Sequence, residues 1–141
     1  MGSKIFLDTN IFIDYFDKTR GNHFSAREII MRIEKNSIKG FIAESVINTT
    51  VYLIKKGYTI IELRKNMDEL ISMFTVLPCS NTTIHKAYRL PTNDLEDAVL
   101  YQLALENKLD YFITEDKKGF KKLSSPLLPV LNGIELLKLI I

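Results

Sequence analysis

KIFLDTNIFIDYF, residues 4–16, joins two kinds of hydrophobic pattern at a single aspartate. Residues 4–7 form a short apolar run that is typical of a strand, whereas residues 10–16 carry apolar side chains at helical spacing. The aspartate between the two runs is Asp8. The pattern therefore predicts a strand that passes into a helix, with a carboxylate at the junction.

The same alternation continues along the chain. Further helices are predicted over residues 25–40, 44–57, 59–74, 81–90, 93–109 and 133–141, and further strands over residues 41–43, 75–79, 110–114 and within 124–131. Ser25 is a candidate N-cap for the first of these helices, and Gly40 lies at or beyond its end. Short strands that alternate with helices indicate an α/β domain whose parallel sheet is covered on both faces.

The length and composition are those of one soluble globular domain. The chain has 141 residues, of which 46% are hydrophobic and 26% are charged. We predict a single domain over residues 4–141 and set Met1-Gly2-Ser3 aside as residues of the kind that expression vectors add. No apolar run approaches the length of a membrane helix, so no membrane association is expected. A net charge of +2 is too small to indicate a polyanionic partner by itself.

The single cysteine limits the chemistry of the chain. Cys79 has no second cysteine with which to form an intramolecular disulfide or a multi-cysteine zinc site. A chain without disulfides fits a reducing compartment, so we expect a cytoplasmic protein.

Four aspartates are predicted to converge at one edge of the sheet. Asp8 and Asp116 each follow a predicted strand, and the carboxyl ends of parallel strands meet at the same edge. Asp94 and Asp97 are three residues apart near the start of a predicted helix, so they project from one face of it. Carboxylates brought together in this way repel one another unless a cation is present. The pattern therefore predicts a Mg²⁺ site that is completed by water and a substrate phosphate, suited to hydrolysis of a phosphodiester.

Each of these aspartates also has a purely structural interpretation. Asp8 and Asp94 would both serve as helix N-caps, and capping is the favoured role for Asp94. Asp97 falls in a first helical turn, where the helix dipole favours a carboxylate. Asp116 would suit a turn. The functional interpretation depends on their concurrence at predicted strand and helix ends.

Taken together, these segments resemble the PIN-domain nucleases, a family that includes the toxins of VapC-type toxin-antitoxin pairs. FLDTNIFIDYF resembles the opening motif of that family, and NDLEDAVLYQLALENKLDYFITEDKKGF resembles its C-terminal pair of motifs. The resemblance implies a three-layer α/β/α PIN-like domain with a central parallel sheet. It also implies Mg²⁺- or Mn²⁺-dependent endonucleolytic cleavage of an RNA substrate by a metal-activated water, with an antitoxin protein and a second copy of the chain as partners.

The resemblance also implies roles for particular residues. The carboxylates that it assigns to the metal are those of Asp8, Asp97 and Asp116. Asp94, one helical turn before Asp97, corresponds to an extra acid that is either a ligand or a neighbour of the ligands. Asn10 and Thr114 match small polar positions that support the site.

One acid of the family pattern is absent. Many members carry a glutamate within the helix that follows the second strand, where this chain has Thr49 or, in another alignment, Asn48. Glu44 lies about one turn too early, and it either supports the site or simply suits the first turn of its helix. The alternative function is therefore a catalytically impaired PIN domain that acts as an RNA- or protein-binding module.

Two further features are compatible with an RNA-cleaving dimer. Lys117 and Lys118 follow Asp116 closely and are candidate phosphate contacts, although a run of lysines is often only a solvated surface. The apolar helix faces around Tyr52 and Met73 are candidate dimer contacts.

Overall fold

The fold is built on one parallel sheet. The computed structural model describes residues 2–140, so Met1 and Ile141, the outermost residues of the segments considered above, lie outside the described residues. Five strands pair in the order β3-β2-β1-β4-β5. They are β1 (Lys4–Leu7), β2 (Lys39–Ala43), β3 (Phe74–Leu77), β4 (Tyr111–Ile113) and β5 (Val130–Leu131). Every pairing is parallel, as the alternation of strands and helices predicts.

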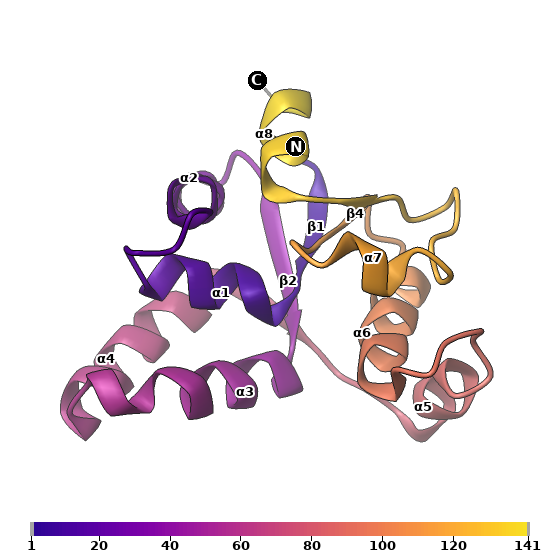
Figure 1. Ribbon diagram of the computed structural model, residues 1–141, viewed down its shortest axis with the longest axis horizontal. Coiled ribbons are helices and arrows are strands. Elements are labelled where there is room, and N and C mark those ends of the chain that lie inside the picture. Colours follow the sequence, from indigo (N-terminus) through magenta and orange to yellow (C-terminus); the bar gives the residue numbers. More distant parts are fainter. Residues whose placement is uncertain (1, 141) are drawn as a thin grey trace.

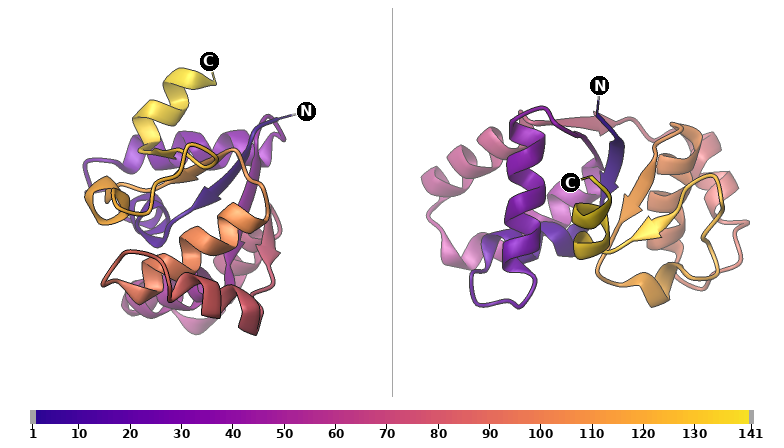
Figure 2. Two further views of the ribbon diagram at one scale, coloured as in Figure 1. Left: turned by 90° about the vertical axis from the view of Figure 1, so that its right-hand side faces the viewer. Right: turned by 90° about the horizontal axis from the view of Figure 1, so that it is seen from above.

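Helices connect the strands and cover both faces of the sheet. They are α1 (Thr9–Phe16), α2 (His23–Glu34), α3 (Glu44–Ile54), α4 (Ile60–Ile71), α5 (Asn81–Ala87), α6 (Leu95–Glu106), α7 (Lys117–Phe120) and α8 (Gly133–Leu139), with a 3₁₀ turn η1 (Lys55–Gly57) after α3. Figure 1 shows α1 to α4 on one side of β1 and β2, and α5 and α6 on the other side. The views in Figure 2 show the same arrangement from the side and from above. The predicted α/β/α class is confirmed.

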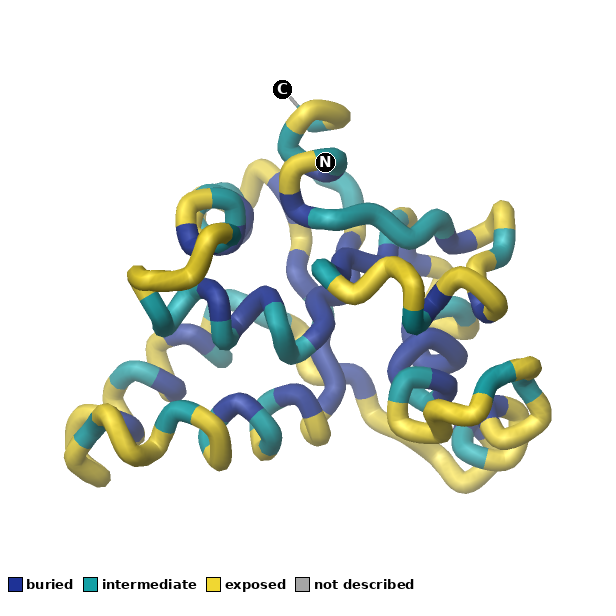
Figure 3. Tube along the Cα trace, viewed as in Figure 1, coloured by how far each residue is buried: buried dark blue, intermediate teal, exposed yellow. Residues whose placement is uncertain are grey.

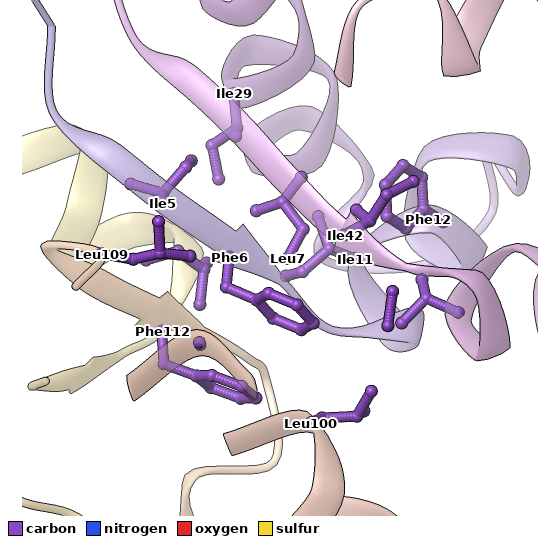
Figure 4. Packing of buried hydrophobic residues seen from close by; sticks show 14 of the residues in the cluster. Ile5, Phe6, Leu7, Ile11, Phe12, Ile29, Ile42, Leu100, Leu109 and Phe112 are labelled. Carbon is purple, nitrogen blue, oxygen red and sulfur yellow. The ribbon is translucent and has the colours of Figure 1, made fainter. Parts of the chain in front are cut away.

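Strand β1 is buried on both faces because its side chains alternate. Ile5, Phe6 and Leu7 are each 0% exposed. In Figure 4, Ile5 points towards Ile29 of α2, whereas Phe6 points to the opposite face, towards Phe112 of β4. The rings of Phe6 and Phe112 stack with centroids 5.1 Å apart. Burial of each such side chain contributes about 1.5–3 kcal/mol, so β1 is the centre of the core.

The ends of the fold are more exposed than its middle. Figure 3 shows buried residues concentrated along the central strands and exposed residues along the outer turns. The Ser3 carbonyl accepts a hydrogen bond of 2.8 Å from the Lys39 amide, so pairing with β2 begins before Lys4.

No helix within residues 2–140 combines the length and the apolar character needed to cross a membrane.

Helix α2 differs from its prediction at both ends. It begins at His23 and ends at Glu34, so Ser25 is not its N-cap. The Ser25 hydroxyl lies inside the first turn and donates to the Asn22 carbonyl at 3.0 Å. The ring of His23 lies 2.9 Å from the Asp14 carbonyl of α1. Helix α2 therefore begins at a residue that contacts α1, two positions before the cap that the local sequence indicates.

Gly40 lies within β2 rather than beside a helix end. A Cβ atom at this position would lie 2.6 Å from the ring of Phe74, so a larger residue here would displace that ring. The chain leaves α2 instead through Asn36, whose φ of 62° is left-handed.

Candidate active site

Asp8 lies where β1 ends, at the carboxyl edge of the sheet. Its backbone amide still pairs with the Ile113 carbonyl of β4 at 3.0 Å, and its side chain then caps α1 by accepting from the Thr9 amide at 2.8 Å. The residue is only 7% exposed. Capping and site formation are thus compatible, because one carboxylate oxygen binds the helix while the other oxygen points to a different set of partners.

That second oxygen is held by two polar side chains. Thr114, which is 0% exposed, donates from Oγ1 to Asp8 Oδ2 at 2.8 Å. Asn10 Nδ2 lies 3.2 Å from Thr114 Oγ1 and 3.4 Å from Asp8 Oδ2. The Asp116 amide donates to Thr114 Oγ1 at 3.0 Å, and the Glu115 amide donates to Asn10 Oδ1 at 3.2 Å. Asn10 and Thr114 therefore connect Asp8 to the turn that carries Asp116.

The other acids come from the start of α6. Asp94 is its N-cap, since Oδ1 accepts from the Asp97 amide at 3.0 Å. The structure places the four predicted aspartates along one open cleft of about 970 Å³. Glu96, in the same first turn, also lines this cleft and was not predicted from the sequence. Asp94 and Asp97 are spaced so that they share one face of α6. The cleft also reaches Glu96, which lies on another side of the same first turn.

The acids affect one another strongly. Burial raises the pKa of Asp97 to about 7, together with repulsion from Asp8, a hydrogen bond shared with Asp94, and the charges of Asp94 and Asp116. Burial also raises the pKa of Asp8, while hydrogen bonds from Thr114 and Thr9 act in the opposite direction. Burial and mutual repulsion thus both disfavour the charged carboxylates, and a bound cation would favour the charged forms again.

The donor set fits a hard divalent cation. All five acidic side chains at this end of the cleft offer oxygen ligands, which Mg²⁺ and Mn²⁺ prefer. Within residues 2–140, however, no group of three or more His, Cys, Asp or Glu side chains is close enough to hold a metal ion by itself. The geometry suits an ion that takes few protein ligands and completes its shell with water and substrate oxygens.

Helix α3 contributes a hydroxyl group where the family pattern has an acid. Of the two candidate positions, Thr49 lines the cleft, whereas Asn48 is exposed to solvent. Glu44 is exposed in the first turn of α3, outside the residues that line the cleft.

The lysines after Asp116 are not among the residues that line the cleft. Residues 117–120 form the short helix α7, and Lys117 Nζ binds both carboxylate oxygens of Glu135 at 2.8 and 3.0 Å. Lys117 and Lys118 line a separate hollow beside Phe120. The cations that line the cleft are Lys18 and Arg20, from the loop between α1 and α2. They were not predicted from the sequence, because neither belongs to a run of basic residues. Their position directly after α1, the helix that follows Asp8, is the signal that could have identified them.

Known proteins share both the sequence pattern and the fold. Ribonuclease VapC1 of Aquifex aeolicus (strain VF5) is 26% identical over 125 residues, which cover 83% of this chain and 84% of the relative. The structure of VapBC2 from Rickettsia felis, bound to a DNA fragment from their promoter, is similar with a TM-score of 0.66 and 16% identity, over 92% of this chain and 98% of the other. A toxin-antitoxin complex from Klebsiella pneumoniae gives a TM-score of 0.65 and 21% identity, over 88% of this chain and 94% of the other.

The family model described as PIN domain matches residues 4–118. This match runs from the first residue of β1 into helix α7, so it contains all the acids of the cleft and both polar residues that connect them. By this match, which spans most of its length, the chain belongs to the PIN domain family.

Proposed function

We propose that this chain is a metal-dependent endoribonuclease of the PIN-domain type, which hydrolyses RNA phosphodiester bonds. The observation that carries the proposal is the arrangement of Asp8, Asp97 and Asp116 along one cleft at the carboxyl edge of the sheet. The relative named Ribonuclease VapC1 supports the reaction class. Asp8, Asp97 and Asp116 would supply the few protein ligands of a Mg²⁺ or Mn²⁺ ion, water and substrate oxygens would complete its shell, and Asp94 would lie beside them.

The chain's own residues prepare this chemistry in three ways. Thr114 and the Thr9 amide orient the Asp8 carboxylate before any ligand arrives. Asp94 fixes the first turn of α6 and with it the position of Asp97. The carboxyl group of Asp97, with its pKa of about 7, is ready to lose a proton when positive charge enters the cleft. A divalent cation, when bound, would activate a water for attack and neutralise charge that develops on the phosphate.

Cleavage of a labelled mixed RNA tests the proposal directly. Wild-type protein should cleave in Mg²⁺ or Mn²⁺ but not in EDTA, and both Asp8→Asn and Asp97→Asn should abolish cleavage. Asp68→Asn is the matched control, because this aspartate is exposed on α4, outside the residues that line the cleft. Full activity in the Asp97→Asn protein, with its fold verified by circular dichroism, would refute the assignment.

We further propose that the enzyme is the toxin of a toxin-antitoxin pair, with an antitoxin protein as its partner. The support is the family together with the two similar solved structures, whose proteins are a VapBC pair and a toxin-antitoxin complex. Expression of the wild type in a bacterial host should stop growth, and expression of the Asp97→Asn protein should not. Equal growth with both proteins would contradict a toxin role while leaving the nuclease proposal to the cleavage assay.

One observation favours the alternative function, an RNA- or protein-binding module without catalysis. Thr49 lines the cleft with a hydroxyl group where the family pattern has a carboxylate. Glu96 offsets this loss, because it adds an acid to the same cleft from the α6 side. RNA binding without cleavage in any metal would decide for the module.

A further inference from the structure

Arg20 is held at the cleft by a buried partner. Its Nε atom lies 2.7 Å from Oδ1 of Asp14, whose side chain is 5% exposed, while the Arg20 side chain is 48% exposed. A carboxylate so far buried is costly without a fixed counter-charge, so the ion pair restrains the arginine in one place. Within residues 2–140, the guanidinium binds Asp14 through Nε alone, which leaves its Nη groups as donors to phosphate oxygens.

The loop that carries Arg20 is itself braced. The Asp17 carboxylate accepts from both the amide and the hydroxyl of Thr19, at 3.0 and 2.6 Å. The Arg20 amide donates to the Asp17 carbonyl at 3.2 Å, and the Arg20 carbonyl accepts from His23 at 3.1 Å. The loop therefore presents Arg20 in a fixed geometry, which lowers the entropy lost when a ligand binds.

The two ends of the cleft carry opposite charge. Asp8, Asp97 and Asp116 lie at the end beside the sheet, whereas Lys18 and Arg20 lie where α1 ends, with the carboxylate of Asp17 held by Thr19. Figure 1 shows α1 and α3 running side by side away from the sheet.

The two ends of the cleft are farther apart than the width of one phosphate group. Asp14, which anchors Arg20, comes six residues after Asp8 along α1, a rise of about 9 Å at roughly 1.5 Å per residue. A phosphate that binds the guanidinium is therefore displaced along the cleft from a phosphate that binds between the acids.

We propose that Arg20, positioned by Asp14 and assisted by Lys18, forms a subsite for a backbone phosphate adjacent to the scissile one. This inference rests on the proposed ribonuclease function and adds a direction to it: the RNA strand leaves the carboxylates along α1, towards the α1–α2 loop. The subsite contributes affinity and register, because contacts to phosphate position a strand without reading its sequence. Asp14 is a positioning residue, which acts only through Arg20.

Binding of a labelled single-stranded RNA in Ca²⁺ tests the subsite apart from cleavage, with the RNA verified as intact after each titration. Arg20→Ala should weaken binding about tenfold and reduce the slope of log K against log salt by about 0.7, the value for one phosphate contact on a single strand. Arg32→Ala is the matched control, because this arginine pairs with Glu28 at 3.3 Å outside the cleft and should change neither quantity.

Removal of Arg20 alone leaves the Asp14 carboxylate buried without its partner, so the double variant Asp14→Asn/Arg20→Ala keeps the test independent of folding. Asp14→Asn alone should weaken RNA binding, and it should have no further effect once Arg20 is alanine. An unchanged salt slope in the double variant would overturn the subsite, as would a lowered kcat with unchanged RNA affinity. If the wild type binds RNA with this Arg20 dependence but cleaves none, the subsite stands and the nuclease proposal fails.

Discussion

The hydroxyl of Thr114 donates a hydrogen bond of 2.8 Å to Asp8 Oδ2 across 106 positions of sequence. The Thr114 Oγ1 atom in turn accepts a hydrogen bond of 3.0 Å from the Asp116 amide. One buried side chain therefore positions two acids of the cleft, from the ends of two neighbouring strands. It also moderates the effect of burial, because its hydrogen bond lowers the pKa of Asp8.

Replacement of Thr114 by valine should therefore affect stability and metal binding together. The substitution keeps the shape but leaves Asp8 Oδ2 and the Asp116 amide without this partner, at an expected cost of about 1–3 kcal/mol in the free energy of unfolding. Mn²⁺ affinity should fall as well, because the pKa of Asp8 rises further. Urea denaturation and a Mn²⁺ titration measure the two effects.

Thr50→Val provides the matched control for this experiment. Thr50 is 1% exposed, and its hydroxyl donates to the Val46 carbonyl within α3, away from the acids. The control should lose some stability and retain its Mn²⁺ affinity. Equal losses of metal affinity in the two variants would show that Thr114 has no special role.

Asp97→Asn should make the metal-free protein more stable at neutral pH. The pKa of Asp97 rises from 3.8 to about 7 in the folded state, so between these pH values the folded protein binds more protons than the unfolded chain. The free energy of unfolding must then fall as pH rises through this window. Since Asp97 is only half-buried and water screens its charge, we expect the variant to gain roughly 1 kcal/mol at pH 8, or about 4 °C in Tm.

Thermal denaturation in EDTA at pH 5 and pH 8 provides the measurement, since these values lie within and above the window of about 4–7. The advantage of the variant over the wild type should be larger at pH 8. Asp68→Asn, on the exposed face of α4, should show no such dependence. A gain that is the same at both pH values would indicate that Asp97 is not under electrostatic strain.

Addition of metal should reverse the effect of Asp97 on stability. A ligand that binds only the folded state at 100 times its Kd stabilises it by about 2.7 kcal/mol. Mn²⁺ should therefore raise the Tm of the wild type, and more at pH 8 than at pH 6, because protons compete for Asp97. The increase should be lost in Asp97→Asn, and EDTA should abolish it. An equal increase in the variant would place the metal elsewhere.

Much of the fold follows from the sequence because hydrophobic periodicity is a local property. Ile5, Phe6 and Leu7 alternate between two buried faces, and such a strand belongs in the middle of a covered parallel sheet. The start of α2 was predicted wrongly for the opposite reason. Ser25 is a good cap by local rules, but the contact between His23 and the Asp14 carbonyl is tertiary and cannot be read from neighbouring residues.

The acids of the site follow from the sequence more readily than its cations. Asp8 and Asp116 are placed by strand ends, which are predictable, and Asp94 by a helix start. Arg20 reaches the cleft only because α1 brings Asp14 beneath it, which depends on how the loop folds. Lys117 had the more suggestive sequence position, but Glu135 from α8 binds it away from the cleft.

Thr49→Glu should strengthen metal binding, because Thr49 lines the cleft and a carboxylate there would add an oxygen ligand to the existing acids. We expect Mg²⁺ affinity to rise about tenfold, equivalent to about 1.4 kcal/mol, and the Tm in EDTA to fall because the added charge increases repulsion. Asn48→Glu is the control, since this neighbouring residue is exposed and should leave both quantities unchanged. Calorimetric titration with Mg²⁺ and melting in EDTA distinguish the two variants. Equal behaviour of the two variants would mean that position 49 does not contribute a ligand to the metal.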